Sequence, residues 1–154
     1  NERKFLKKTD ELLQNRELET QLLEYHFYPR SFGNEIIMYG LGSLLLQFVW
    51  DRHHESCTIS SYFLERNSLL SFKDVRFYEI DIVGVVLNWN SKDELFLDRA
   101  QALDLAQFNP QRVAPTDPVA TVDTIKAKLP ELQSAFSEEN VRMTFGKIKV
   151  LVEE

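Results

Sequence analysis

Residues that could bind a metal ion crowd one short segment of the chain. Asp51, His53, His54, Glu55 and Cys57 lie within seven residues, and each side chain can ligate a divalent cation. The spacing argues against a site, because adjacent residues of a strand point to opposite faces and the sequence has neither a second histidine pair nor a second cysteine. We therefore interpret the segment as a solvated hairpin turn and expect no metal ion and no other cofactor.

Cys57 is also the candidate nucleophile, with a histidine close by in the sequence. The alternation of its neighbours points Cys57 toward the core, where a thiol behaves as a small inert hydrophobe. The glycines at 40 and 42 lack the third glycine, and the strand followed by a helix, that mark a phosphate-binding loop, so they predict a turn. Carboxylate pairs such as Asp93 with Glu94 lack an accompanying acid or base signal. We predict a protein without catalytic residues.

A tryptophan beside an acidic segment is the best candidate for a binding site. Residues 78 to 125 hold three basic and eight acidic side chains, a local charge of −5 that would suit a basic partner. Tryptophan is common at the centres of protein interfaces. The predicted partner-binding residues are Trp89, Asp93, Glu94, Asp98 and Asp104. In the alternative interpretation, Trp89 plugs the end of the core and the carboxylates form a solvated face.

The first elements that must position these residues are a helix and three strands. Residues 2 to about 26 predict one amphipathic helix, because apolar side chains recur among mixed charges without glycine or proline, and Pro29 ends it. Residues 35 to 39, 43 to 52 and 56 to 62 predict an antiparallel meander. In the second strand Leu44, Leu46, Phe48 and Trp50 alternate with other residues and should face the core.

Helices dominate the predictions for the rest of the chain. Residues 63 to 78 fit neither period and are expected to form a loop with a fourth strand or a short helix. A helix is favoured over a buried strand for 80 to 89, and a capping box at 91 to 94 predicts a helix from 92 to about 108. Three prolines make 109 to 118 a surface connection. Short helices are expected at 121 to 129 and 130 to 136, whereas 141 to 152 fits either a helix or a strand with a bulge at Gly146.

Composition limits the class of protein. The chain has 154 residues, 44% of them hydrophobic and 27% charged, as expected of a single globular domain. The net charge of −6 opposes binding to nucleic acid. No apolar stretch approaches the roughly 20 residues that a membrane span needs, so we expect no membrane partner. A single cysteine is more typical of a reducing compartment, which makes the cytoplasm the expected location.

The first part of the chain resembles a group of bacterial proteins. Phe32-Gly33-Asn34, a short strand, a glycine turn and a long apolar strand that ends in Asp51-Arg52, with a further strand after it, are similar to small immunity-type proteins of polymorphic or contact-dependent toxin systems, over about residues 1 to 62. The resemblance implies a non-catalytic cytoplasmic protein that blocks a cognate toxin, often a basic nuclease, with an acidic surface. It transfers no functional residue by position.

Together these patterns predict an α+β fold. It has an N-terminal helix, a three- or four-stranded antiparallel sheet, and C-terminal helices packed on one sheet face. The expected function is binding of a protein partner, as an immunity-like inhibitor of a toxin. One alternative is a small enzyme whose site is assembled from residues distant in sequence. Another is a structural or regulatory subunit whose first helix packs on a second copy of the chain, which would make the protein a homo-oligomer.

Overall fold

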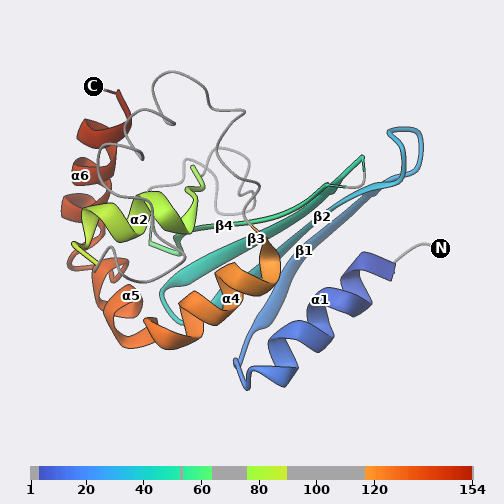
Figure 1. Ribbon diagram of the computed structural model, residues 1–154, viewed down its shortest axis with the longest axis horizontal. Helices are drawn as coiled ribbons and strands as arrows, with labels where there is room; N and C mark the ends of the chain where they lie inside the picture. The colour runs from blue at the N-terminus through green and yellow to red at the C-terminus, as the bar shows by residue number, and fades with distance from the viewer. Residues whose placement is uncertain (1–3, 53, 64–75, 90–116, 154) are drawn as a thin grey trace.

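The structure is a computed structural model that describes residues 4–52, 54–63, 76–89 and 117–153. The order of elements is α1 (Lys4–Asn15), β1 (Gln21–Tyr28), β2 (Asn34–Leu41), β3 (Leu44–Asp51), β4 (His54–Ser61), α2 (Ile80–Val86), α4 (Pro118–Ala127), α5 (Leu129–Ala135) and α6 (Val141–Glu153). The strands form one antiparallel sheet in the order β1-β2-β3-β4. The fold is therefore α+β, with an N-terminal helix and C-terminal helices, as predicted (Figure 1).

The prediction of one helix from 2 to about 26 was wrong, because α1 ends at Asn15 and the chain then forms β1. Glu17 adopts a positive φ of 57°, and the amides of Glu17 and Leu18 donate to the carbonyls of Gln14 and Leu13. These two bonds are the Schellman arrangement that ends a helix. Leu13, in the last turn of α1, and Leu18, just after the helix, are both buried. Pairing of β1 with β2 then overrides the helical propensity of the following residues.

The predicted meander corresponds to β2, β3 and β4, with bounds that differ by one or two residues. Leu44, Leu46 and Phe48 are fully buried, and Trp50 packs at the margin of the core. The fourth strand is β1, which lies at the sheet edge beside β2. Of the stretch from 63 to 78, residues 64–75 lie outside the described residues, and Tyr78 forms an isolated bridge with Ile59 of β4.

The C-terminal helices agree with the predictions where the structure describes them. Residues 80 to 86 are helical, and α4 and α5 occupy the two short helices expected around Pro130. Asp117 caps α4 by accepting a hydrogen bond from the amide of Val119 at 3.2 Å, so this helix starts three residues earlier than expected. The segment from 141 is a helix and not a strand. The predicted capping box and the helix from 92 to 108 lie outside the described residues.

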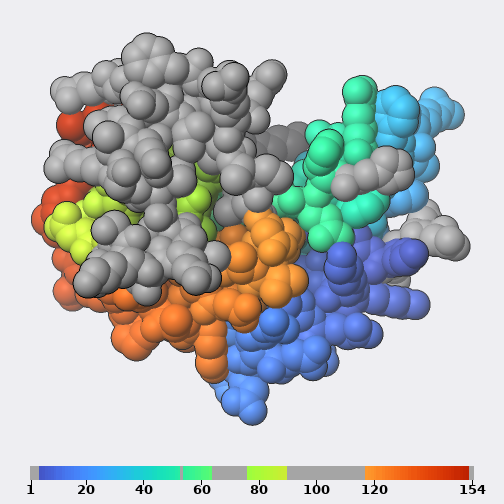
Figure 2. Space-filling model, in the orientation of Figure 1, coloured from blue at the N-terminus to red at the C-terminus, as the bar shows by residue number. Residues whose placement is uncertain are grey.

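One face of the sheet carries the core, and side chains from every described helix pack on it. Phe5, Val83, Ile125, Leu132 and Ile148 are among these side chains. Figure 1 shows α1 and α4 in front of the sheet, and Figure 2 shows their surfaces adjoining. The helices therefore cover the inner face of the sheet.

Candidate functional site

The two ends of the sheet differ in how they are covered. We call the end at the β2–β3 turn, residues 41 to 44, the closed end. There Gln133 of α5 accepts a hydrogen bond from the Ser43 amide at 2.7 Å and donates to the Leu41 carbonyl at 2.9 Å. We call the opposite end, with the β1–β2 loop and the β3–β4 turn, the open end. The candidate site lies at the open end.

A row of four side chains crosses the whole sheet at the open end. Phe27 of β1 pairs with Glu35 of β2, Glu35 with Trp50 of β3, and Trp50 with Glu55 of β4. Residues paired across antiparallel strands project from the same face. The register therefore sets two aromatic rings and two carboxylates alternately in one line.

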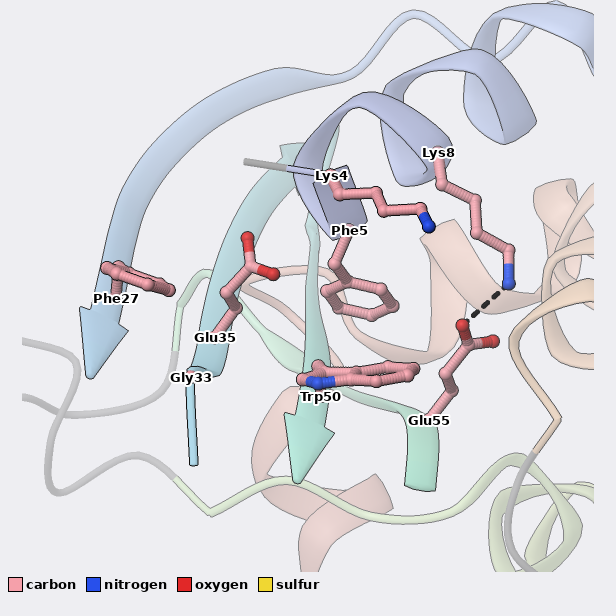
Figure 3. A pocket seen from close by; sticks show the side chains of 8 residues that line it. All are labelled: Lys4, Phe5, Lys8, Phe27, Gly33, Glu35, Trp50 and Glu55. Atoms are coloured by element: carbon pink, nitrogen blue, oxygen red, sulfur yellow. Dashed lines mark hydrogen bonds and ion pairs between the residues drawn. The ribbon is translucent and has the colours of Figure 1, made fainter. Parts of the chain in front are cut away.

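The first turns of α1 lie above this row, and between them lies an open cavity of about 470 Å³. Of the residues that the structure describes, the row and Lys4, Phe5, Lys8 and Gly33 line it (Figure 3). The Phe5 and Trp50 rings are 5.9 Å apart between centroids, with their planes inclined by 42°. A volume in this range is typical of pockets that hold a small molecule or a side chain, roughly 300–1,000 Å³.

The two carboxylates of the row have different partners. Glu55 accepts a hydrogen bond from the Lys8 ammonium at 2.6 Å, and the Lys8 side chain is 63% exposed. Glu35 is only 4% exposed, and its Oε1 accepts a hydrogen bond from the Tyr25 hydroxyl at 2.6 Å. Within the described ranges, neither Glu35 nor Lys4 forms an ion pair. The cavity therefore has a salt bridge at its rim and a buried acid on its floor.

The β1–β2 loop beside the cavity presents an exposed aromatic ring. Phe32 is 71% exposed and has a positive φ of 60°. The Arg52 guanidinium lies 4.5 Å from its ring centroid, and Arg52 also has a positive φ, of 49°. Asn34 joins the two loops, because its side chain donates to Asp51 at 3.0 Å and accepts from the Arg52 amide at 3.1 Å. The Phe32 ring thus faces solvent with the Arg52 guanidinium against it.

The predicted partner-binding residues are only partly within the described ranges. Trp89 is partly buried and packs against the core, as the alternative interpretation expected, with the Lys128 ammonium 5.6 Å from its ring centroid. Asp93, Glu94, Asp98 and Asp104 lie outside the described residues, so the acidic patch stays a prediction.

Other groups with chemical potential lie apart from the cavity. Cys57 is fully buried, as the alternation predicted, and burial raises the pKa of its thiol far above the usual range. Burial raises the pKa of Glu79 to about 7, and the nearby Asp81 adds to the effect. In the described part of the chain, no three side chains of the metal-binding types cluster closely enough to hold an ion. His53 itself lies outside that part.

Sequence reasoning missed the residues that line the cavity. The strands β2, β3 and β4 were predicted. A turn at Gly42 would have paired Glu35 with Trp50, and a two-residue turn after Asp51 would have paired Trp50 with Glu55. Phe27, however, was placed just after a predicted helix and not in a strand, so it could not be paired with Glu35. The contact of Phe5 with Trp50 joins residues far apart in sequence, and periodicity within one element does not report such contacts.

Comparisons with known proteins add no relative: no family model, no curated protein and no solved structure matches this chain. Among the helices that the structure describes, none has the length and apolar character needed to cross a membrane.

Proposed function

We propose that this chain is a non-catalytic protein-binding module that acts in the cytoplasm as an immunity-like inhibitor of a cognate bacterial toxin, and that the open end of the sheet is its contact surface. The presentation of Phe32 carries the proposal. A phenylalanine that is 71% exposed contributes little burial energy to this fold. A positive φ at a non-glycine residue also costs about 1–2 kcal/mol. Burial of the ring in a partner would offset both the lost burial energy and the backbone strain.

The surroundings of Phe32 support the proposal. Tyr28, at the other end of the same loop, is 42% exposed. Arg52 stacks on the Phe32 ring. Tyrosine and arginine are enriched among the few residues that dominate interface energies. A rigid aromatic group also loses little conformational entropy on binding. The loop therefore has the composition and the fixed geometry of an interface anchor.

Charge supports a basic partner. The chain has a net charge of −6, which accelerates encounter with a positively charged protein and opposes contact with nucleic acid. The carboxylates Asp93, Glu94, Asp98 and Asp104, with Trp89, remain the second predicted contact patch. A partner that buries an interface of standard size could touch both this patch and the open end of the sheet.

One observation favours a small enzyme as the alternative. Glu79 has a pKa raised to about 7, which suits a general acid or base near neutral pH. Neither Glu79 nor Asp81 lines the cavity beneath α1. The cavity and the perturbed acid are therefore separate features, and this separation favours the binding module.

The test uses the product of the gene next to the one that encodes this chain. The chain and the C-terminal domain of a large secreted protein encoded there are purified, and their association is measured by calorimetry. We expect one-to-one binding that weakens as salt rises, and protection from growth arrest when both are expressed together. Phe32→Ala should weaken binding at least about tenfold. Met143→Ala, which removes a side chain 58% exposed on α6, is the matched control and should leave binding unchanged.

Two results would contradict the proposal. The first is an absence of binding to the neighbouring product together with a dimeric mass of the chain at rising concentration, which would favour the structural subunit with homo-oligomer contacts. The second is equal affinity of the Phe32→Ala and wild-type proteins, which would remove the open end from the interface. Thermal unfolding of each variant shows that the fold is retained.

A further inference from the structure

The cavity beneath α1 combines aromatic walls with a buried acid. Phe27 and Trp50 lie on either side of Glu35 in the cross-strand row, and Phe5 covers Trp50 from α1. Figure 3 shows the Glu35 side chain reaching up between Phe27 and Phe5. The cavity thus presents π faces around one carboxylate.

Among the described residues, no cation pairs with the Glu35 carboxylate. Its hydrogen-bond donor within the described residues is the neutral hydroxyl of Tyr25, at 2.6 Å, although Glu35 is only 4% exposed. A buried carboxylate is costly unless a cation pairs with it. Lys8 is engaged with Glu55 at 2.6 Å, and the Lys4 ammonium points away from Glu35 (Figure 3). A cation supplied from outside would therefore complete the site.

We propose that this cavity receives an arginine side chain of the protein partner, with its guanidinium on the Glu35 carboxylate and its plane against the Trp50 ring. The identity of the partner rests on the proposed function, but the chemistry of the cavity does not. A guanidinium suits the site better than an ammonium, because it is planar, stacks on aromatic rings and can donate two parallel hydrogen bonds to a carboxylate.

The lysines at the rim suggest the opposite occupant, an anionic amphiphile with its head group on Lys4 and its chain in the cavity. Two observations disfavour it. Lys8 already has an acidic partner, Glu55. An anion held in the cavity would also lie beside the uncompensated charge of Glu35, and like charges in a partly desolvated site repel strongly. Binding of an anionic amphiphile in this cavity would contradict the proposal.

The test titrates the isolated chain with three small probes, so it needs no partner. N-acetyl-arginine amide carries the proposed group, the corresponding citrulline amide has the same shape without the charge, and decanoate represents the anionic amphiphile. Binding is followed by calorimetry and by the NMR signal of the Trp50 indole N–H. We expect the arginine probe to bind at least about tenfold more tightly than the citrulline probe. Decanoate should not move the Trp50 signal.

Variants assign this binding to the cavity. Glu35→Gln removes the charge but keeps an oxygen that can accept from Tyr25, and it should reduce arginine binding to the level of citrulline. Glu24→Gln makes the same change on the opposite face of the sheet. Glu24 pairs with Met38, whose side chain points away from the face that carries Ile37 and Tyr39. This variant should bind as the wild type does. Trp50→Leu, a second variant that leaves the acid intact, should weaken arginine binding about tenfold or less through the lost π face.

The proposal is overturned if the arginine and citrulline probes bind equally, or if Glu35→Gln binds like Glu24→Gln. It is also overturned if decanoate binds and Lys4→Met abolishes that binding. These outcomes are distinct from a failure of the proposed function. Binding of the neighbouring protein that depends on Phe32 but not on Glu35 would leave the function standing without this cavity, and probe binding without a toxin partner would do the reverse.

Discussion

At the closed end of the sheet a turn is held by a side chain from a distant helix, whereas at the open end a loop holds an aromatic ring out in solvent. Gln133 bonds to the Ser43 amide and the Leu41 carbonyl. Beside it, the Ser61 hydroxyl donates to the Phe136 carbonyl at 2.7 Å. At the open end, the side-chain bonds of the loops join Asn34 to Asp51 and Arg52 and are exposed.

The difference indicates that the closed end contributes to the stability of the fold and the open end to recognition of a partner. Hydrogen bonds that join the sheet to α5 are partly or fully shielded from water, so breaking them leaves polar groups without a substitute partner. Exposed bonds between two loops can be replaced by water at little cost. Substitutions at the closed end should therefore affect folding, and substitutions at the open end should affect binding.

The largest expected effect comes from Gly42→Ala at the closed end. Gly42 has a φ of 59°, and a Cβ added there would lie 2.5 Å from the amide atoms of Gln133. The strain of the left-handed conformation and the displacement of Gln133 together should lower the free energy of unfolding by about 3 kcal/mol. Urea denaturation measures this change.

Gly33→Ala is the matched variant at the open end. Gly33 has a similar φ of 70°, but the nearest atom to an added Cβ is Cε2 of Phe27, at an ordinary 3.9 Å. Only the conformational cost remains, about 1 kcal/mol. If the two variants lose the same stability, the contrast between the ends is wrong.

Gln133→Ala should have the next largest effect. It removes the acceptor of the Ser43 amide and the donor to the Leu41 carbonyl, and part-buried groups left without partners should cost about 2 kcal/mol. Asn34→Ala removes two side-chain bonds from exposed positions, whereas Gln133→Ala removes three, and it should cost about 0.5 kcal/mol. Equal losses in urea denaturation would show that the two ends contribute alike.

The sequence predicted more of the closed end than of the open end. The alternation of Leu44, Leu46 and Phe48 correctly placed these side chains in the core, because side chains of a strand alternate between its two faces. Leu45, on the opposite face, is fully buried as well. β1 was missed for a physical reason. Its residues 22 to 25 fit a helical stripe as well as a strand, and the decision came from pairing with β2, which is a tertiary effect.

The candidate site was less predictable than the fold. Glu35 follows the loop at the start of a strand, a position where a carboxylate is usually solvated, and the sequence does not show that Tyr25 and α1 bury it. Phe32 likewise gave no sign of exposure, since a phenylalanine near a glycine fits a turn packed on the core. The residues that were predicted to bind, from Asp93 to Asp104, lie outside the described residues and stay a prediction.

The free energy of unfolding should depend on pH because of one buried acid, Glu79. The pKa of Glu79 is raised from an ordinary 4.5 to about 7, first by burial and then by Asp81. Between these values the folded protein binds more protons than the unfolded chain, so the free energy of unfolding falls as pH rises from about 4.5 to 7. Above pH 7 the penalty is fully present.

Glu79→Gln stays neutral and should lack this decline, so it should be more stable than the wild type at pH 8 and nearly equal at pH 4. Urea denaturation across this range measures the difference, and Glu11→Gln, on the exposed side of α1, is the control. A difference that is independent of pH would show that Glu79 titrates normally.

The last comparison concerns the strain at Phe32. Phe32→Ala and Phe32→Gly both remove the ring and its contact with Arg52, and both should weaken partner binding to the same extent. They differ only at the backbone, because glycine adopts a φ of 60° without the steric penalty of a Cβ. Phe32→Gly should therefore be more stable than Phe32→Ala by about 1 kcal/mol, as measured by urea denaturation. Such a gap means that the loop keeps a residue that binds where glycine would fold better, whereas equal stabilities would mean that the loop relaxes in solution and that the open end is not preorganised.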